Sequence, residues 1–149
     1  MRTKTPTTPL SRAELVSLSN DIRLACMRIS RRVRFESDRE LPPHLYSVLV
    51  RLEEAPRTNS ELADIERVSA PSMKRTTSAL VELGYVSRAD DPTDGRQVIL
   101  SLTPEGQKVL RRVRRHRDEW MLSRFEHLTD EERELLQRAA AVLAKVASK

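Results

Sequence analysis

Apolar residues recur every three or four positions over several long stretches of the chain, and this period predicts amphipathic helices. The longest stripe begins at Leu15, directly after a capping box formed by Ser11 and Glu14, and continues to Val33. Pro42–Pro43 then ends this helix, because proline is not tolerated in a helix interior. The apolar positions of the stripe are Leu15, Leu18, Ile22, Cys26, Ile29 and Val33.

Capping residues and prolines divide most of the remaining chain into five further helices. The second helix ends before Pro56, and the fourth ends at Gly84, which suits the position after a helix. The third to sixth helices begin at the caps Thr58, Ser69, Thr103 and Thr129. The inward positions expected for the second, third and fourth helices are Leu45, Val48, Leu49 and Leu52; Leu62, Ala63 and Ile65; and Met73, Thr77 and Leu80.

The period changes between the fourth and fifth helices. Residues 85–88 and 97–102 are short β-prone runs, and the residues between them are rich in Asp, Pro and Gly. We therefore expect a β-hairpin there and the element order α-α-α-α-β-β-α-α. This fold class is mainly α with a small β-hairpin wing, which is a winged helix-turn-helix. Such a fold inserts a helix into the DNA major groove while the hairpin reaches an adjacent groove or phosphate.

The fourth helix and the hairpin tip carry the residues that fit this chemistry. With Met73 and Leu80 inward, the helical period places Arg75 outward, and Lys74 lies beside it. Arginine can donate to a guanine edge and lysine to a phosphate, while the N–H groups behind Ser69 favour an anion. Arg96 at the hairpin tip suits the minor groove.

One extended motif resembles the MarR family of bacterial transcriptional regulators. The pattern runs from the end of the fourth helix, through an Asp-x-Arg wing tip, to a strand-to-helix junction. The matching positions are Leu80, Gly84, Arg88, Asp94, Arg96, Leu102, Thr103 and Gly106. The chain departs from the family pattern at residues 38–41, which look short, at Pro42–Pro43, and at Lys74 and Thr76.

The resemblance implies an obligate homodimer that binds double-stranded DNA and responds to a small-molecule effector. It implies a helical dimerisation region at residues 10–40 and 104–149 and a DNA-binding lobe at residues 42–103. Residues 1–9 are rich in Thr and Pro and are expected to form a flexible N-terminus. Asp94 is expected to hold the wing against Arg88. The DNA-contacting residues that it implies are Ser69, Ala70, Ser72, Lys74, Arg75 and Thr76 in the fourth helix and Arg96 in the wing.

Composition and the absence of certain motifs argue against several other classes of protein. The chain of 149 residues has a net charge of +5, one cysteine, and no cluster of residues with metal-ligand spacing, so we expect neither a metal nor a cofactor. It lacks an apolar run long enough for a membrane span and a visible secretory signal, so we expect a cytoplasmic protein. It also lacks the common catalytic motifs, which argues against an enzyme.

The sequence allows more than one interpretation of three features. Cys26 lies on the apolar stripe and is interpreted as a core residue, with a redox-sensing thiol as the alternative. The arginines at 28–34 and 111–117 form solvated faces, pair with acids across a dimer, or extend the phosphate footprint. The function expected is a repressor that binds a pseudo-palindromic operator. A winged-helix protein–protein interaction module without specific DNA binding is the alternative.

Overall fold

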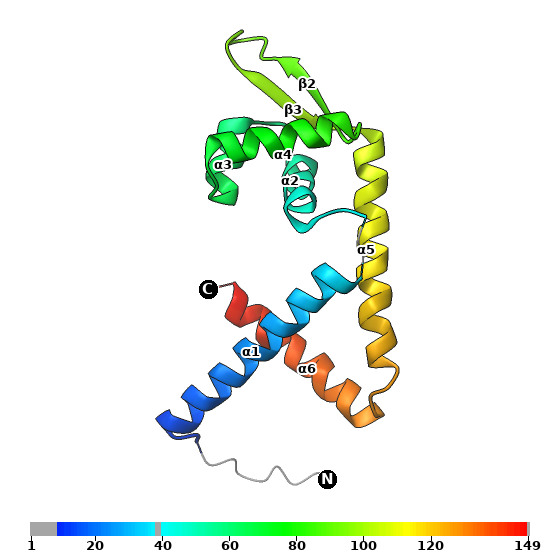
Figure 1. Cartoon of the computed structure of the whole chain (residues 1–149). Helices are drawn as coiled ribbons and strands as arrows, with labels where there is room; N and C mark the ends of the chain where they lie inside the picture. The colour runs from blue at the N-terminus through cyan, green and yellow to red at the C-terminus, as the bar shows by residue number, and fades with distance from the viewer. Residues whose placement is uncertain (1–8, 38–39, 149) are drawn as a thin grey trace.

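The computed structural model describes residues 9–37 and 40–148 and contains six helices and a three-stranded sheet within them (Figure 1). The first eight residues of the predicted flexible N-terminus lie outside the described residues. The elements in chain order are α1 (Arg12–Glu36), α2 (Pro43–Glu54), β1 (Arg57–Thr58), α3 (Asn59–Glu66), α4 (Ala70–Glu82), β2 (Val86–Asp90), β3 (Val98–Leu102), α5 (Pro104–Phe125) and α6 (Asp130–Ala147).

The predicted caps begin the helices. Ser11, Thr58 and Thr129 each form a full capping box with the glutamate three residues later. Ser69 and Thr103 accept a hydrogen bond from the backbone N–H three residues later. These side chains satisfy N–H groups that have no partner within their own helix, and the helix order predicted from the sequence is confirmed.

The sheet is larger than the predicted hairpin. Strands β2 and β3 pair antiparallel as expected, with Val86 opposite Leu102 and Asp90 opposite Val98. In addition, β1 pairs with the other edge of β3, giving the order β1-β3-β2. Strand β1 is not predicted from the sequence, because two residues are too few to show an alternating pattern.

The hydrophobic core lies between α2, α3, α4, the sheet and the first half of α5. Its members are Leu41, Leu45, Val48, Leu49, Leu52, Leu62, Ala63, Met73, Leu80, Val86, Leu100, Val109, Leu110 and Val113. Ile65, predicted to face inward, is instead 39% exposed. The elements from α2 to β3 form a compact unit, here called the lobe.

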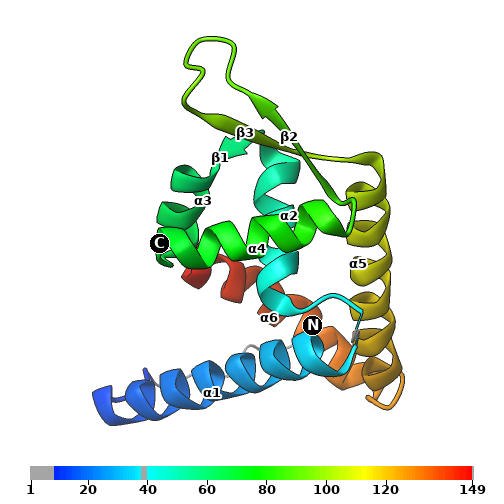
Figure 2. The same cartoon turned by 45° about the horizontal axis from the view of Figure 1, so that its top comes forward.

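Helices α1 and α6 and the second half of α5 form an arm on the side of the lobe away from the hairpin (Figure 1), and Figure 2 shows α1 running outward from the lower part of α5. Neither α1 nor α6 contains a buried residue. The core interpretation of Cys26 is therefore wrong for the single chain, because its side chain is exposed on α1. The apolar stripe of α1 exists as predicted, but nothing in the described part of the chain covers most of it.

Candidate nucleic-acid interface

The turn between α3 and α4 depends on one residue with unusual backbone geometry. Arg67 follows α3 in the left-handed conformation, with a φ of 54°, and the N–H of Val68 donates to the carbonyl of Ala63 at 3.0 Å. This geometry ends α3 and turns the chain into Ser69, the cap of α4. The sequence does not reveal this turn, because a left-handed residue after a helix is usually recognised as a glycine.

A buried hydrogen bond fixes α4 against α3. The Thr77 hydroxyl, on a side chain that is 3% exposed, donates to Asn59 Oδ1 at 2.7 Å. A second contact joins α3 to α2, where Glu66 accepts from the Ser47 hydroxyl at 2.5 Å and from Arg51 Nε at 3.0 Å. The helix-turn-helix is therefore held by polar contacts as well as by its apolar core.

The outer face of α4 presents most of the residues predicted to contact DNA. Ser69, Ala70, Lys74 and Arg75 are exposed, whereas Ser72 and Thr76 are partly buried. The Thr76 hydroxyl donates to the carbonyl of Ser72 at 3.2 Å, so its proton is used within the helix. A shallow hollow on this face is lined by Pro71, Lys74, Arg75, Ser78, Ala79 and Glu82.

The wing tip is organised by two carboxylates. Asp91 Oδ1 accepts from the backbone N–H and the hydroxyl of Thr93, both at 2.7 Å, and these bonds lower the pKa of Asp91. Asp94 accepts from the backbone N–H of Arg96 at 3.1 Å and from the side-chain amide of Gln97 at 3.3 Å. The contribution of Asp91 was not foreseen in the sequence.

The prediction that Asp94 pairs with Arg88 is wrong. Its carboxylate bonds to groups of the turn itself rather than to the guanidinium of Arg88, which is exposed on β2 opposite Leu100. An aspartate at the start of a tight turn is closer to the N–H groups two or three residues ahead than to a side chain on the paired strand. The side chain of Arg96 is exposed, as predicted.

The base of the wing is joined to α4 and α5 through Thr103. Its hydroxyl donates to the carbonyl of Gly84 at 2.7 Å and accepts from the N–H of Gly106 at 3.1 Å. A Cβ on Gly106 would lie 2.3 Å from the carbonyl oxygen of Tyr85, so only glycine allows this approach. The junction motif therefore sets the direction in which the wing leaves α4 and α5.

The basic residues fall into two groups, those that pair with a carboxylate of the chain and those that do not. On α5, Arg114 forms a two-pronged ion pair with Glu53 of α2, at 2.9 Å for one contact, and Arg112 pairs with Glu40. Within the part of the chain that the structure describes, Lys74, Arg75 and Arg96 have no carboxylate partner. Part of the arginine-rich face of α5 thus holds the first half of α5 against α2 and the segment before it, while the cations of α4 and the wing are free for another anion.

Neither a metal-ligand cluster nor a membrane-spanning helix occurs in the described residues. Over residues 9–37 and 40–148, no three His, Cys, Asp or Glu side chains gather as metal ligands would. In the same residues, no helix is long and apolar enough to cross a bilayer.

Comparison with known proteins identifies the fold and its class. The model of the MarR family matches residues 41–98, which span the helix-turn-helix and most of the wing. The HTH-type transcriptional regulator Mb0904 of Mycobacterium bovis is 38% identical over 128 residues, covering 85% of this chain and 90% of the relative. The regulator ML2140 of Mycobacterium leprae is 36% identical over 132 residues, covering 87% of this chain and 92% of the relative. The chain belongs to the MarR family.

Solved structures agree with this assignment. The YusO protein of Bacillus subtilis superposes with a TM-score of 0.71 at 25% identity, covering 93% of this chain and 99% of YusO. A mutant of MepR from S. aureus, bound to an oligodeoxyribonucleotide, superposes with a TM-score of 0.66 at 19% identity, covering 88% of this chain and 96% of MepR. The winged helix-turn-helix predicted from the sequence is confirmed, and this MarR-family chain is a DNA-binding transcriptional regulator.

Proposed function

We propose that this MarR-family protein is a homodimeric repressor that binds a pseudo-palindromic operator and is released from it by a small-molecule effector. The observation that carries the proposal is the set of three exposed basic side chains on α4 and the wing, Lys74, Arg75 and Arg96, none of which has a carboxylate partner in the described chain.

The proposed DNA-binding mode assigns a separate task to each part of this surface. The first turns of α4 enter the major groove, where Arg75 donates to a guanine edge and Lys74 to a phosphate. Ser69 and Ala70, at the helix N-terminus, approach the DNA backbone, since the positive end of the α4 dipole favours an anion. Arg96 extends from the wing into the adjacent minor groove. MepR, which shares the fold, was solved with an oligodeoxyribonucleotide, and this supports DNA as the partner.

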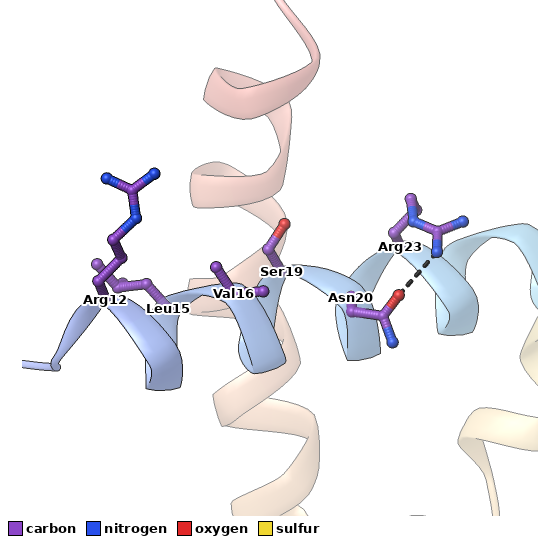
Figure 3. Close-up of a pocket in the computed structure, with 6 residues that line it drawn as sticks. All are labelled: Arg12, Leu15, Val16, Ser19, Asn20 and Arg23. Atoms are coloured by element: carbon purple, nitrogen blue, oxygen red, sulfur yellow. Dashed lines mark hydrogen bonds between the residues drawn. The ribbon is translucent and has the colours of Figure 1, made fainter.

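A homodimer is supported by the open apolar surface of the arm. Large apolar side chains on α1 and α6 are exposed to an unusual degree, including Leu15 at 52%, Leu135 at 58% and Val146 at 72%. A hollow on α1 is lined entirely by that helix, with Arg23 donating to Asn20 at 2.7 Å (Figure 3). A second copy of the chain would cover these surfaces. We therefore assign residues 10–40 and 104–149 to dimerisation and residues 42–103 to DNA binding.

Release by an effector is supported by the way the lobe joins the arm. The lobe reaches the arm through α5, and the ion pairs of Glu53 with Arg114 and of Glu40 with Arg112 fasten α2 and the segment before it to the first half of α5. A dimer places its half-sites about one helical turn, ~34 Å, apart. A ligand that tilts each lobe on α5 would change this separation and weaken binding.

The test is a titration of the purified full chain with the DNA directly upstream of its own gene, in a salt series, with unrelated DNA as competitor. We expect specific binding with a steep negative dependence on salt, because phosphate contacts release counterions. Equal and weak binding to both duplexes requires a selection from random duplexes. Failure of that selection to enrich any sequence would contradict the proposal and favour a protein–protein interaction module. The molar mass in solution tests the dimer.

A further inference from the structure

Three side chains at the start of α4 form a short series of hydrogen bonds that ends on Arg75. The Ser69 hydroxyl accepts from the N–H of Ser72 at 3.3 Å and donates to the Ser72 hydroxyl at 3.1 Å. The Ser72 hydroxyl in turn accepts from Arg75 Nη2 at 3.2 Å. These residues are three apart, so their side chains lie on one face of the helix.

After these hydrogen bonds are formed, Ser72 and Arg75 still have N–H and O–H donors that can bond to another molecule. Ser72 Oγ uses both lone pairs, one for Ser69 and one for Arg75, so its own proton is available to another acceptor. Arg75 engages one of the five N–H donors of a guanidinium and pairs with no carboxylate in the described chain. The side chains of Ser72 and Arg75 therefore offer donors and no free acceptor.

A donor-only surface discriminates between bases in the major groove. Guanine presents two acceptors there, N7 and O6, which match the fork of an arginine. Adenine and cytosine each present an amino group, which would oppose a donor. The arginine guanidinium recognises guanine best when it is already oriented toward the base edge. A long flexible side chain that is already held in one direction also loses less conformational entropy on binding DNA.

We propose that Ser72 is a positioning residue that holds the Arg75 guanidinium, and that this contact makes one base pair of each half-site selective for guanine. The proposal rests on the proposed function, because it specifies how α4 reads the operator. Its effect is on base discrimination at one position rather than on DNA affinity in general, which comes mainly from phosphate contacts.

The chain offers a matched control for this role. Ser78 lies on the same face of α4, three residues beyond Arg75, and its hydroxyl forms no hydrogen bond within the described residues. Replacing Ser72 with alanine removes the hydroxyl but keeps the backbone N–H that Ser69 caps. The helix start is therefore preserved in the variant.

The experiment compares the wild-type chain with Ser72→Ala, Ser72→Thr, Ser78→Ala and Arg75→Ala. An operator is first selected from random duplexes with the wild-type chain. Each variant is then titrated against the operator and every single base-pair substitution of it, with melting temperatures measured in parallel. We expect Ser72→Ala to reduce the preference for guanine at one position per half-site by about 3- to 10-fold, less than Arg75→Ala at the same position. Ser72→Thr, which keeps a hydroxyl, and Ser78→Ala should retain the preference.

Each contrary outcome is distinguishable. A Ser72→Ala variant with the wild-type preference at every position overturns the positioning role and leaves the proposed function intact. An equal loss at all positions with a lower melting temperature also overturns it, since Ser72 would then act on the fold. A wild-type chain that enriches no sequence overturns the proposed function and this proposal with it.

Discussion

Thr77 of α4 and Asn59 of α3 are joined by a hydrogen bond of 2.7 Å from the threonine hydroxyl to the amide oxygen. Thr77 is the one buried polar side chain in the core of the described residues. The bond connects the first residue of α3 to the middle of α4, so it fixes the angle between the two helices of the helix-turn-helix. An unpaired amide oxygen at this place would carry the cost of its lost hydration.

Replacing Thr77 with valine should lower the free energy of unfolding by about 1–3 kcal/mol, because the shape is kept while Asn59 loses its partner. Denaturant titration measures this change. Asn59→Ala and the double variant complete a mutant cycle, and we expect the two losses to be less than additive. Strict additivity would show that the bond contributes nothing.

Substitution by alanine should have different effects on stability at Gly106 and at Gly95. A Cβ on Gly106 would meet the Tyr85 carbonyl oxygen at 2.3 Å and Leu102 Cδ1 at 2.6 Å, so Gly106→Ala must displace the backbone at Tyr85 or the start of α5. We expect a loss of about 1–3 kcal/mol in the free energy of unfolding. Gly95→Ala meets nothing within 4 Å and should change stability by less than about 0.5 kcal/mol. Similar melting temperatures for both variants would refute this account.

Arg67 allows a test of the turn between the helices. A non-glycine residue in the left-handed conformation costs about 1–2 kcal/mol, so Arg67→Gly should give a more stable chain than Arg67→Ala. At the exposed helical position Asp64, one turn earlier, the order should reverse, because alanine is favoured over glycine by about 1 kcal/mol inside a helix. The four variants are compared by thermal unfolding. The same order at both positions would argue against a left-handed turn at Arg67.

The features that could be predicted from the sequence depend on interactions between residues close together in the chain. The features that could not be predicted depend on contacts between residues far apart in the chain. The caps Ser11, Thr58 and Thr129 act over three residues, so the helix starts were readable. The Glu53–Arg114 pair joins residues 61 apart in the chain, and no local pattern shows it. The prediction that Cys26 is buried is wrong for the single chain, because a helical stripe shows that a face is apolar but not whether its own chain or another covers it.

Removing Arg75 and removing Arg96 should affect DNA binding in different ways. We expect Arg75→Ala to cost about 1–3 kcal/mol in operator binding and to relax the preference at one base pair. Arg96→Ala should cost a similar amount, about 1–3 kcal/mol, with discrimination retained at the base pair that Arg75 reads. Arg115→Ala is the control, because Arg115 lies on α5 and pairs with Glu119 at 3.8 Å. Titration of the selected operator measures all three. Unchanged affinity for both test variants would refute the assignment of the interface.

The single tryptophan reports on the contact between α1 and α5. Trp120 lies against Arg124, whose guanidinium carbon is 3.3 Å from the ring centroid, and near Arg32 at 5.7 Å. Glu36 bonds to Arg32 at 2.9 Å and faces Arg124 at 3.5 Å. The hydrogen bond from Arg32 is the main cause that lowers the pKa of Glu36, and Trp120 and Arg124 act in the same direction.

Because the pKa of Glu36 is lower in the folded chain than in the unfolded chain, the stability that Glu36 contributes decreases toward acidic pH. The contribution of Glu36 to stability is present above the pKa of an unfolded glutamate and is lost as the pH falls through the lower folded value. We therefore expect the fluorescence of Trp120 to change in the acidic range, below about pH 4.5. Glu36→Gln should remove this transition, whereas Glu105→Gln, at the far end of α5, should keep it. A transition that persists unchanged in Glu36→Gln would show that another group controls the tryptophan.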